Sequence, residues 1–281
     1  MILRSIAARR AVSASATLLM GLATLLVLLP LGIIFYHIIR MGFGSINMEF
    51  FTNIPQPPGE PGGGMANGLA GSAVMIGMAS LVGVPVGIFG AIYLTEYGIG
   101  RMATAIRFCA DVLSGIPSII TGMVAYSLLV VPLKGFSALA GSFALALIMI
   151  PIVLRTTEEQ LKMVPVSLRE ASLALGVPLW RTSLKVTLRS ALTGVITGIL
   201  LAVARVAGET APLLFTALGN QFWSKSLTEP MAALPLQIFS FAISPYEDWH
   251  RLAWAGALVL VVIMFGLSLA ARWMGSSRRS G

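Results

Sequence analysis

Six long stretches of this chain contain almost no charged side chains, and this feature limits its possible folds more than any other. They lie at residues 18–39, 69–93, 108–131, 137–154, 191–217 and 252–271. An α-helix of about 20 residues crosses the ~30 Å hydrocarbon core of a bilayer, and each stretch has that length or nearly so. The sequence therefore predicts an all-α membrane protein with six transmembrane helices.

The composition excludes the other broad classes of protein. Only 11% of the 281 residues are charged, against about 25% in soluble domains, while 57% are hydrophobic. Such a chain has too few polar residues to cover a soluble core and is too apolar to be disordered. The single cysteine, Cys109, rules out an internal disulfide bond, and we expect it to be a small packing residue.

The basic residues indicate which loops face the cytoplasm. Of the 19 Lys and Arg residues, three precede the first stretch, two separate the second from the third, six lie at residues 155–189 and three follow the sixth stretch. The opposite loops hold only Lys134, Lys225 and Arg251. Because basic residues accumulate in cytoplasmic loops, both termini are predicted to be cytoplasmic. The net charge of +8 then reflects membrane topology, and no nucleic-acid partner is expected.

This topology divides the chain into a cytoplasmic N-terminal segment at residues 1–17, a transmembrane domain at 18–271 and a cytoplasmic tail at 272–281. The cytoplasmic loop at residues 155–190 carries a helical pattern. Ser167 and Glu170 have the spacing of a capping box, in which each side chain accepts a hydrogen bond from the other residue's N–H. Gly176 is expected to end this short helix, whose one face would hold Leu168, Ala171, Ser172 and Leu175.

The same loop resembles that of a known protein family. The E-A-A-x3-G-x9-I-x-L-P loop of bacterial ABC importer permeases has the spacing of Glu170, Ala171, Ser172, Gly176, Val186 and Leu188. The sequence departs from this pattern at Ser172, usually Ala, and at Arg189, usually Pro. The resemblance implies a coupling helix on which an ATPase acts, with Ser167, Glu170, Ala171 and Gly176 as its residues.

A second resemblance is more specific. Residues 205–216, R-V-A-G-E-T-A-P-L-L-F-T, are similar to the R-x2-GETAPLLFT segment of phosphate ABC transporter permeases of the PstA type. Shorter matches occur in the same order, namely G-G-G at 62–64 with Asn67, Y-L-T-E-Y at 93–97, S-G-I-P-S at 114–118 and P-M-A at 230–232. The resemblance implies a type I ABC importer permease fold, with six helices and a cytoplasmic coupling helix.

The resemblance also implies an inner-membrane importer that moves inorganic phosphate by alternating access. Its partners would be a homologous phosphate permease, two ATP-binding cassette subunits, a periplasmic phosphate-binding protein, phosphate itself and membrane lipid. None of the four Lys residues is preceded by Gly, so the chain has no G-x4-G-K-[ST] loop. We therefore expect ATP and Mg²⁺ on the partner ATPase, and neither a cofactor nor an enzymatic activity on this chain.

Arg205 is the sharpest candidate for contact with the transported anion. At 1.5 Å per residue it lies about 21 Å along a helix that starts at Ala191, where an unpaired charge is expensive. Glu209 is four residues further on and is expected to pair with it. We expect Arg205 to face the pathway and Glu209 to limit how tightly the anion is held. The alternative is an ion pair that only fixes helix packing.

Four further polar residues accompany this pair. Thr210 follows Glu209, and Ser114 and Ser118 lie one helical turn apart, so all three could line the substrate pathway. Asp111 is predicted to form a structural ion pair, either with Arg107 or with a basic residue on another helix, because a carboxylate repels phosphate.

Two outer loops, residues 42–68 and 219–251, are predicted to dock the binding protein. They carry several aromatic residues and the acidic residues Glu49, Glu60, Glu229, Glu247 and Asp248. His37 and His250 are isolated, and no metal site is expected.

The residues leave two other functions open. The chain could carry another oxyanion or small solute, because a guanidinium and a hydroxyl serve any oxyanion. It could also be a secondary transporter, with Asp111, Arg205 and Glu209 coupling to an ion. A membrane enzyme is remote, since no H-E-x2-H motif occurs.

Overall fold

The computed structural model describes residues 6–276. Arg4, Arg278 and Arg279, on which part of the topology prediction rests, lie outside the described residues. So do residues 1–5 of the predicted N-terminal segment and 277–281 of the predicted tail. Within the described range the secondary structure is helical, apart from a single β-bridge between Leu218 and Met231.

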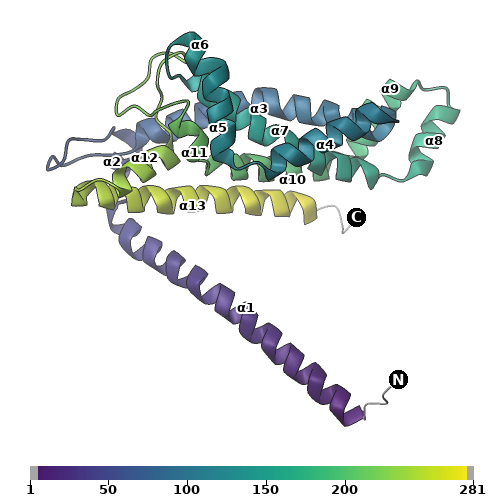
Figure 1. Cartoon of the computed structure of the whole chain (residues 1–281), viewed down its shortest axis with the longest axis horizontal. Helices are drawn as coiled ribbons and strands as arrows, with labels where there is room; N and C mark the ends of the chain where they lie inside the picture. Colours follow the sequence, from purple (N-terminus) through teal and green to yellow (C-terminus); the bar gives the residue numbers. More distant parts are fainter. Residues whose placement is uncertain (1–5, 277–281) are drawn as a thin grey trace.

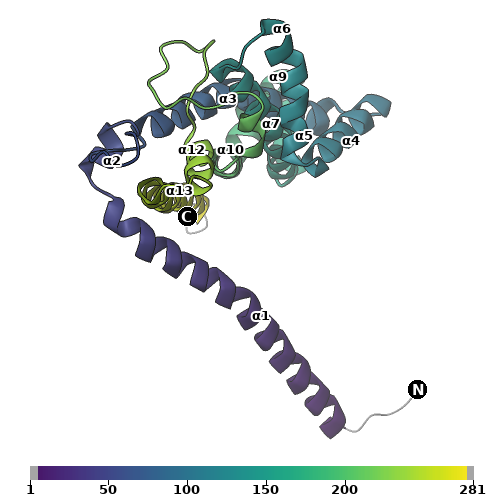
Figure 2. The same ribbon diagram turned by 60° about the vertical axis from the view of Figure 1, so that its left-hand side comes forward.

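Long helices dominate the structure. They are α1 (Ile6–Gly42), α3 (Ala66–Ile92), α7 (Ala138–Lys162), α10 (Leu188–Ala207) and α13 (Glu247–Ser276). Five helical segments of the described chain are long and apolar enough to cross a membrane, or six if one bent pair counts as a single span. The helices α3, α7, α10 and α13 lie side by side, whereas α1 diverges from them (Figures 1 and 2). The first and sixth stretches predicted from the sequence lie within α1 and α13.

The third apolar stretch is not one straight helix, which corrects the prediction for residues 108–131. It forms α4 (Arg101–Gly115) and α5 (Ser118–Ala125), which continues through the π-helical turn η3 (Tyr126–Val130) into α6 (Val131–Leu133). The two arms are bent by 107° at Ile116 and Pro117. Ile116 is extended because a residue before proline avoids the helical conformation. We call this bend the elbow.

The fifth stretch also ends its helix earlier than predicted. The helical run starts at α9 (Leu179–Thr182), passes through the π-helical turn η4 (Ser183–Thr187) and ends with α10 at Ala207. Residues 208–217 leave the helix axis and contain only the short helix α11 (Ala211–Leu214). Pro212 sits in the first turn of α11, where its missing N–H costs nothing.

The loop predicted at residues 155–190 is shorter, because α7 continues to Lys162. The short helix α8 (Val166–Ala174) follows it, and Pro165 is its N-cap residue without a side-chain capping bond. The capping box predicted for Ser167 and Glu170 is therefore wrong, since Ser167 lies inside the first turn. Proline fixes its own φ and disfavours helix in the residue before it, so the helix starts directly after Pro165.

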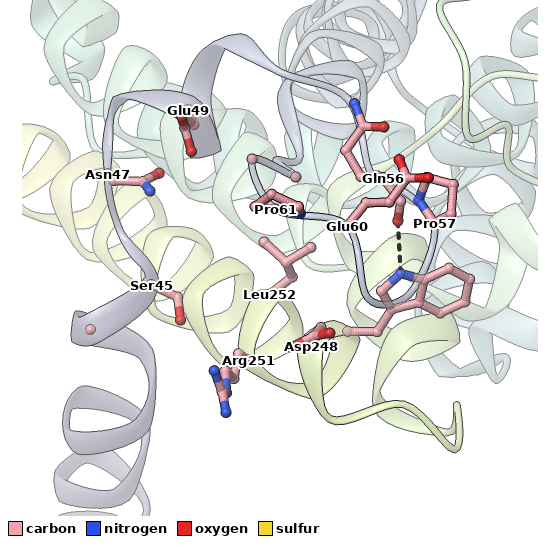
Figure 3. A pocket seen from close by; sticks show the side chains of 14 residues that line it. Ser45, Asn47, Glu49, Gln56, Pro57, Glu60, Pro61, Asp248, Arg251 and Leu252 are labelled. Atoms are coloured by element: carbon pink, nitrogen blue, oxygen red, sulfur yellow. Dashed lines mark hydrogen bonds between the residues drawn. The ribbon is translucent and has the colours of Figure 1, made fainter.

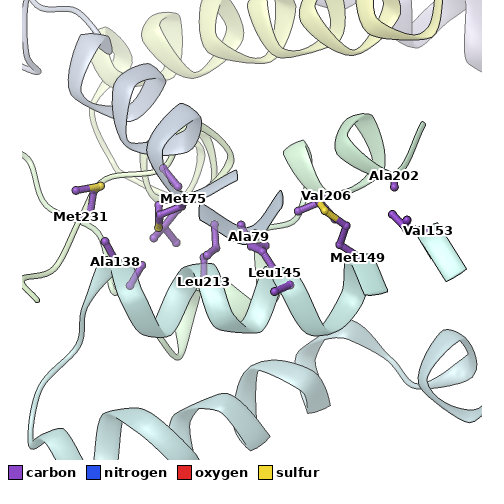
Figure 4. Packing of buried hydrophobic residues seen from close by; sticks show 14 residues of the cluster. Met75, Ala79, Ala138, Leu145, Met149, Val153, Ala202, Val206, Leu213 and Met231 are labelled. Atoms are coloured by element: carbon purple, nitrogen blue, oxygen red, sulfur yellow. The ribbon is translucent and has the colours of Figure 1, made fainter. Parts of the chain in front are cut away.

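The core lies where α3 packs along α7 and α10. Figure 4 shows Met75 and Ala79 of α3 against Leu145, Met149 and Val153 of α7, with Val206 and Ala202 of α10 next to Met149 and Val153. The contact face of α3 repeats every four residues and is made mostly of small side chains. Small residues let membrane helices approach closely, which increases dispersion contacts and favours association in lipid.

The remaining short elements lie at the opposite end of the molecule from α8. They are η1 (Phe43–Ser45) and α2 (Met48–Thr52), which follow α1, and α12 (Leu234–Ala242), which precedes α13. The π-helical turn η2 (Tyr93–Tyr97) lies instead at the end of α3 that is next to α8. The loop between α11 and α12 satisfies the N-terminus of α7. The N–H groups of Ser137, Ala138 and Leu139 donate to the carbonyls of Thr216, Glu229 and Leu227, at 2.9, 3.1 and 3.1 Å.

Helix α1 has little contact with this bundle. Its most apolar window is entirely exposed, and it meets α13 near its C-terminal end, where His37 lies edge-on to Trp254 at 5.0 Å between ring centroids. A Cβ on Gly42 would come within 2.6 Å of the Trp254 carbonyl oxygen, so glycine is needed at this crossing.

The close approach of α3 and α7 predicts different outcomes for two glycines of α3. A Cβ on Gly87 would lie 2.7 Å from Cβ of Val153 and 3.1 Å from the backbone nitrogen of Leu154, whereas a Cβ on Gly77 would meet nothing within 4 Å. Gly87→Ala should destabilise the protein by about 1–3 kcal/mol through overpacking. Gly77→Ala should be neutral or stabilise it by up to ~1 kcal/mol through helix propensity. Thermal unfolding in detergent measures both, and equal midpoints would contradict this packing.

Candidate functional site

A cavity of about 350 Å³ lies between the elbow, α7 and α10. Its polar lining consists of Ser114, Ser118, Thr121 and Arg205, and the other lining side chains are Leu and Ile. The elbow therefore brings together the two serines and the arginine that the sequence singled out, although they lie about ninety residues apart in the chain. Ser118 is the first residue of α5, so the N-terminus of this helix lies at the cavity.

Arg205 and Glu209 form the predicted ion pair, through Nη1 of Arg205 and Oε1 of Glu209. The side chain of Arg205 is 60% exposed, whereas that of Glu209 is 7% exposed. Glu209 lies beyond the end of α10, because Gly208 is the C-cap residue, and its N–H donates to the Val206 carbonyl at 3.1 Å. The guanidinium thus has one anionic partner at its buried side and free donors toward the cavity.

The three candidate hydroxyl residues differ in their placement. Ser114 lines the cavity, but its hydroxyl donates to the Ala110 carbonyl at 2.8 Å. Ser118 lines the cavity and is half-buried. Thr210 does not line it; it is the N-cap residue of α11, and its carbonyl accepts from the N–H groups of Leu213 and Leu214. The geometry therefore favours the two serines over Thr210 as neighbours of Arg205.

Asp111 pairs with Arg155 of α7, which is the second of the two partners considered from the sequence. The carboxylate of Asp111 is 61% exposed. Arg107, the alternative partner, instead donates to Glu158 of α7 at 2.9 Å and to the Leu94 carbonyl at 2.9 Å. These contacts tie α4 to α7 on the side of the cavity that faces α8.

Glu158 is the centre of this charge cluster, and the sequence analysis did not identify it. It is buried, with 2% of its side chain exposed, and it faces Arg107 at 2.9 Å, Lys162 at 2.7 Å and Arg155 at 3.4 Å. A buried carboxylate needs such partners because burial removes its hydration. Lys162 lies four residues after Glu158, so the sequence spacing could have indicated this ion pair. Arg107 lies 51 residues before Glu158, so no local spacing could have indicated that contact.

The proposed coupling residues lie at the far end of α7 (Figure 1). Gly176 ends α8 as predicted, with φ of 78°, a region that favours glycine. Its N–H donates to the Leu173 carbonyl at 2.9 Å, and the N–H of Val177 donates to the Ser172 carbonyl at 3.3 Å. These two bonds form a Schellman motif.

Ser167, Glu170 and Ala171 are all exposed on α8. On the face predicted from the sequence, Ser172 is buried, whereas Leu168 and Leu175 are exposed in the isolated chain. The helix thus presents a carboxylate and apolar side chains outward, a surface suited to a protein partner.

The two predicted outer loops meet at the opposite end of the molecule. The indole N–H of Trp249 donates to the Gln56 carbonyl at 3.2 Å, and the N–H of Gly59 donates to Asp248 at 3.3 Å. A pocket of about 250 Å³ between them is lined by Glu49, Glu60, Asp248 and Arg251 among others (Figure 3). Glu229 and Glu247 do not line this pocket. Cys109 is exposed, so the expectation of a packing residue is wrong for the isolated chain.

The chain is similar in sequence to known transport proteins. Residues 83–280 match the family described as binding-protein-dependent transport system inner membrane component. The phosphate transport system permease protein PstA of Yersinia pestis is 47% identical over 258 residues, which cover 92% of this chain and 85% of that protein. The protein named PstA 1 of Mycobacterium tuberculosis strain H37Rv is 36% identical over 280 residues, covering 96% and 91%.

Solved transporter structures have a similar fold. A bacterial alginate ABC transporter, in complex with an alginate pentasaccharide-bound periplasmic protein, has a chain that matches with a TM-score of 0.61 at 15% identity, covering 96% of each chain. The inward-facing MetNI methionine ABC transporter matches with a TM-score of 0.56 at 20% identity, covering 74% of this chain and 91% of that one. At these identities the likeness concerns the fold, and it confirms the predicted all-α architecture.

The charge cluster predicts a contrast between two neighbouring glutamates. Glu158→Gln leaves three cations without their shared anion and should lower the unfolding midpoint in detergent by about 5 °C or more. Glu159→Gln is the matched control, because Glu159 is exposed and should tolerate the change. If both variants unfold at the same temperature as the parent, the cluster does not stabilise the contact between α4 and α7.

Proposed function

Because the chain belongs to the family of binding-protein-dependent transport inner membrane components, and within it to the phosphate permeases of the PstA type, we propose that it is the membrane permease subunit of an ATP-driven phosphate importer. It is a multi-pass inner membrane protein. The observation that carries the proposal is the exposed guanidinium of Arg205 beside a cavity that it shares with Ser114 and Ser118.

The cavity can hold an oxyanion without trapping it. A guanidinium presents two parallel N–H donors that fit two oxygens of phosphate. Glu209 already satisfies part of this charge, so the net attraction for an arriving anion is smaller than that of a free arginine. The Leu and Ile side chains that line the rest of the cavity have no hydrogen-bond donors, so they cannot replace the hydration shell of phosphate. These features favour transient contact, which transport requires, over tight binding.

The energy for transport comes from other subunits. Two ATP-binding cassette subunits bind ATP and Mg²⁺, and this chain binds no cofactor and has no ATPase activity of its own. The exposed surface of α8, with Ser167, Glu170 and Ala171, is the docking element for these subunits. Their closure moves α8, and the permease alternates between outward-facing and inward-facing states.

The other partners occupy the remaining faces. A homologous permease completes the pathway, because the cavity is open and Arg205 is largely exposed in the single chain. The outer pocket between the two loops contributes to the dock for a periplasmic phosphate-binding protein. Both termini lie in the cytoplasm, as does α8, whereas α2 and α12 lie on the periplasmic side.

Removing the guanidinium should stop transport without preventing assembly. In proteoliposomes containing the complete complex, Arg205→Gln should reduce ATP-dependent phosphate uptake at least tenfold, because no other cation lines the cavity among the described residues. Arg101→Gln is the matched control, since Arg101 is exposed at the start of α4 and lies outside the cavity. Uptake at the parent rate by an assembled Arg205→Gln complex would contradict the pathway role. Uptake that needs no ATP would favour a secondary transporter.

Changing the end of α8 should separate ATP hydrolysis from transport. Gly176→Val forces a β-branched residue into a left-handed conformation, which should distort α8 and lower the phosphate moved per ATP hydrolysed. Gly176→Asn tolerates that conformation and should retain most of the coupling. The ratio of phosphate uptake to ATP hydrolysis in proteoliposomes measures the effect. An unchanged ratio in Gly176→Val would count against α8 as the coupling element.

A further inference from the structure

Helix α8 is attached to the rest of the chain by polar contacts on its buried side. Arg169 supplies most of them, with 17% of its side chain exposed. Its Nε donates to Oε1 of Glu96 at 3.0 Å, its Nη2 donates to the Leu161 carbonyl at 2.7 Å, and its Nη1 lies 3.4 Å from the Val164 carbonyl. One guanidinium therefore contacts three separate acceptors.

Two of these acceptors belong to the ends of long helices, and the third, Val164, lies just after α7. Leu161 lies in the last turn of α7, where the carbonyls carry partial negative charge, and its carbonyl also accepts from the N–H of Val164 at 3.2 Å. Glu96 lies in η2, the turn that continues α3, and only 5% of its side chain is exposed. A carboxylate buried to this extent depends on its cation. Arg169 thus joins α8 to α3 and α7 at the place where these two helices end together.

A second contact joins α8 to the next helical run. The hydroxyls of Ser172 and Thr182 lie 2.9 Å apart, and both residues are buried. Thr182 ends α9, which continues through η4 into α10. The opposite side of α8 is exposed, including Ser167, Glu170 and Ala171. The helix is therefore a separate small body held between the ends of α3 and α10.

We infer that Arg169 is a positioning residue for transport, which passes displacement of α8 to α3 and α7 through its ion pair with Glu96. An apolar contact resists compression but lets surfaces slide or separate. A buried guanidinium with three directed hydrogen bonds also resists pulling and rotation. Because α3 packs on α7 along the core, a displacement at Glu96 reaches the wall of the Arg205 cavity. This inference rests on the proposed function, since it requires a partner that moves α8.

The test compares two substitutions of Glu96 in the complete complex reconstituted in proteoliposomes. Glu96→Leu removes the acceptor for Arg169, whereas Glu96→Gln keeps an acceptor oxygen at the same distance from the backbone. Glu96→Leu should reduce the phosphate moved per ATP hydrolysed at least tenfold while ATP hydrolysis stays within about threefold of the parent. Glu96→Gln should retain more than half of the parent ratio. Arg169→Gln should behave like Glu96→Leu.

Lys185→Gln is the matched control, because it removes an exposed cation from the same cytoplasmic segment and should leave the ratio unchanged. The inference is overturned if Glu96→Leu retains the parent ratio, or if transport and ATP hydrolysis fall together in all three Glu96 and Arg169 variants. The latter result would indicate a loss of folded complex only. Failure of the parent complex to transport phosphate would instead overturn the proposed function, so the two failures are distinguishable.

Discussion

Hydrocarbon cannot hydrogen-bond to a peptide group or hydrate a charge, and the structure depends on this constraint throughout. The backbone satisfies itself in long helices, and the loop after α11 supplies carbonyls to the N-terminus of α7. The side chains follow the same constraint. Glu96, Asp111, Glu158 and Glu209 each form an ion pair with an arginine. Each of these four carboxylates therefore has a cation that compensates for lost hydration.

The matched arrangements differ in a way that accounts for their roles. Glu158 is buried and faces three cations, which makes it a fixed contact between α4 and α7. Arg205 faces a single carboxylate and is largely exposed to the cavity. A saturated buried pair changes little when solvent or ligand arrives, whereas an exposed guanidinium with unused donors can exchange partners. The same chemistry therefore supplies rigidity at Glu158 and an accessible hydrogen-bond donor at Arg205.

The sequence predicted the features that depend on neighbours in the chain. Apolar length identified the long helices, the spacing of Arg205 and Glu209 predicted their pairing, and the position of Gly176 predicted the end of α8. Two local predictions were wrong because a proline, and not the expected capping or apolar pattern, determines where the helix starts. Pro165 starts α8 ahead of the expected cap, and Pro117 turns one expected span into an elbow. Arg107, which pairs with Glu158, and Glu96, which pairs with Arg169, come from distant parts of the chain, so no spacing rule could identify these two contacts.

We propose that the exposed guanidinium, the elbow and the coupling helix together serve phosphate import. The most direct test of this proposal is the uptake of labelled phosphate at low micromolar concentration by phosphate-starved cells, with and without this gene, in a strain without other high-affinity phosphate systems. Excess sulfate or molybdate is added as competitor. The account predicts that uptake is lost on deletion and that, when the gene is present, neither competitor reduces it. Unchanged uptake on deletion would contradict the account, and strong inhibition by either competitor would assign the cavity to another oxyanion.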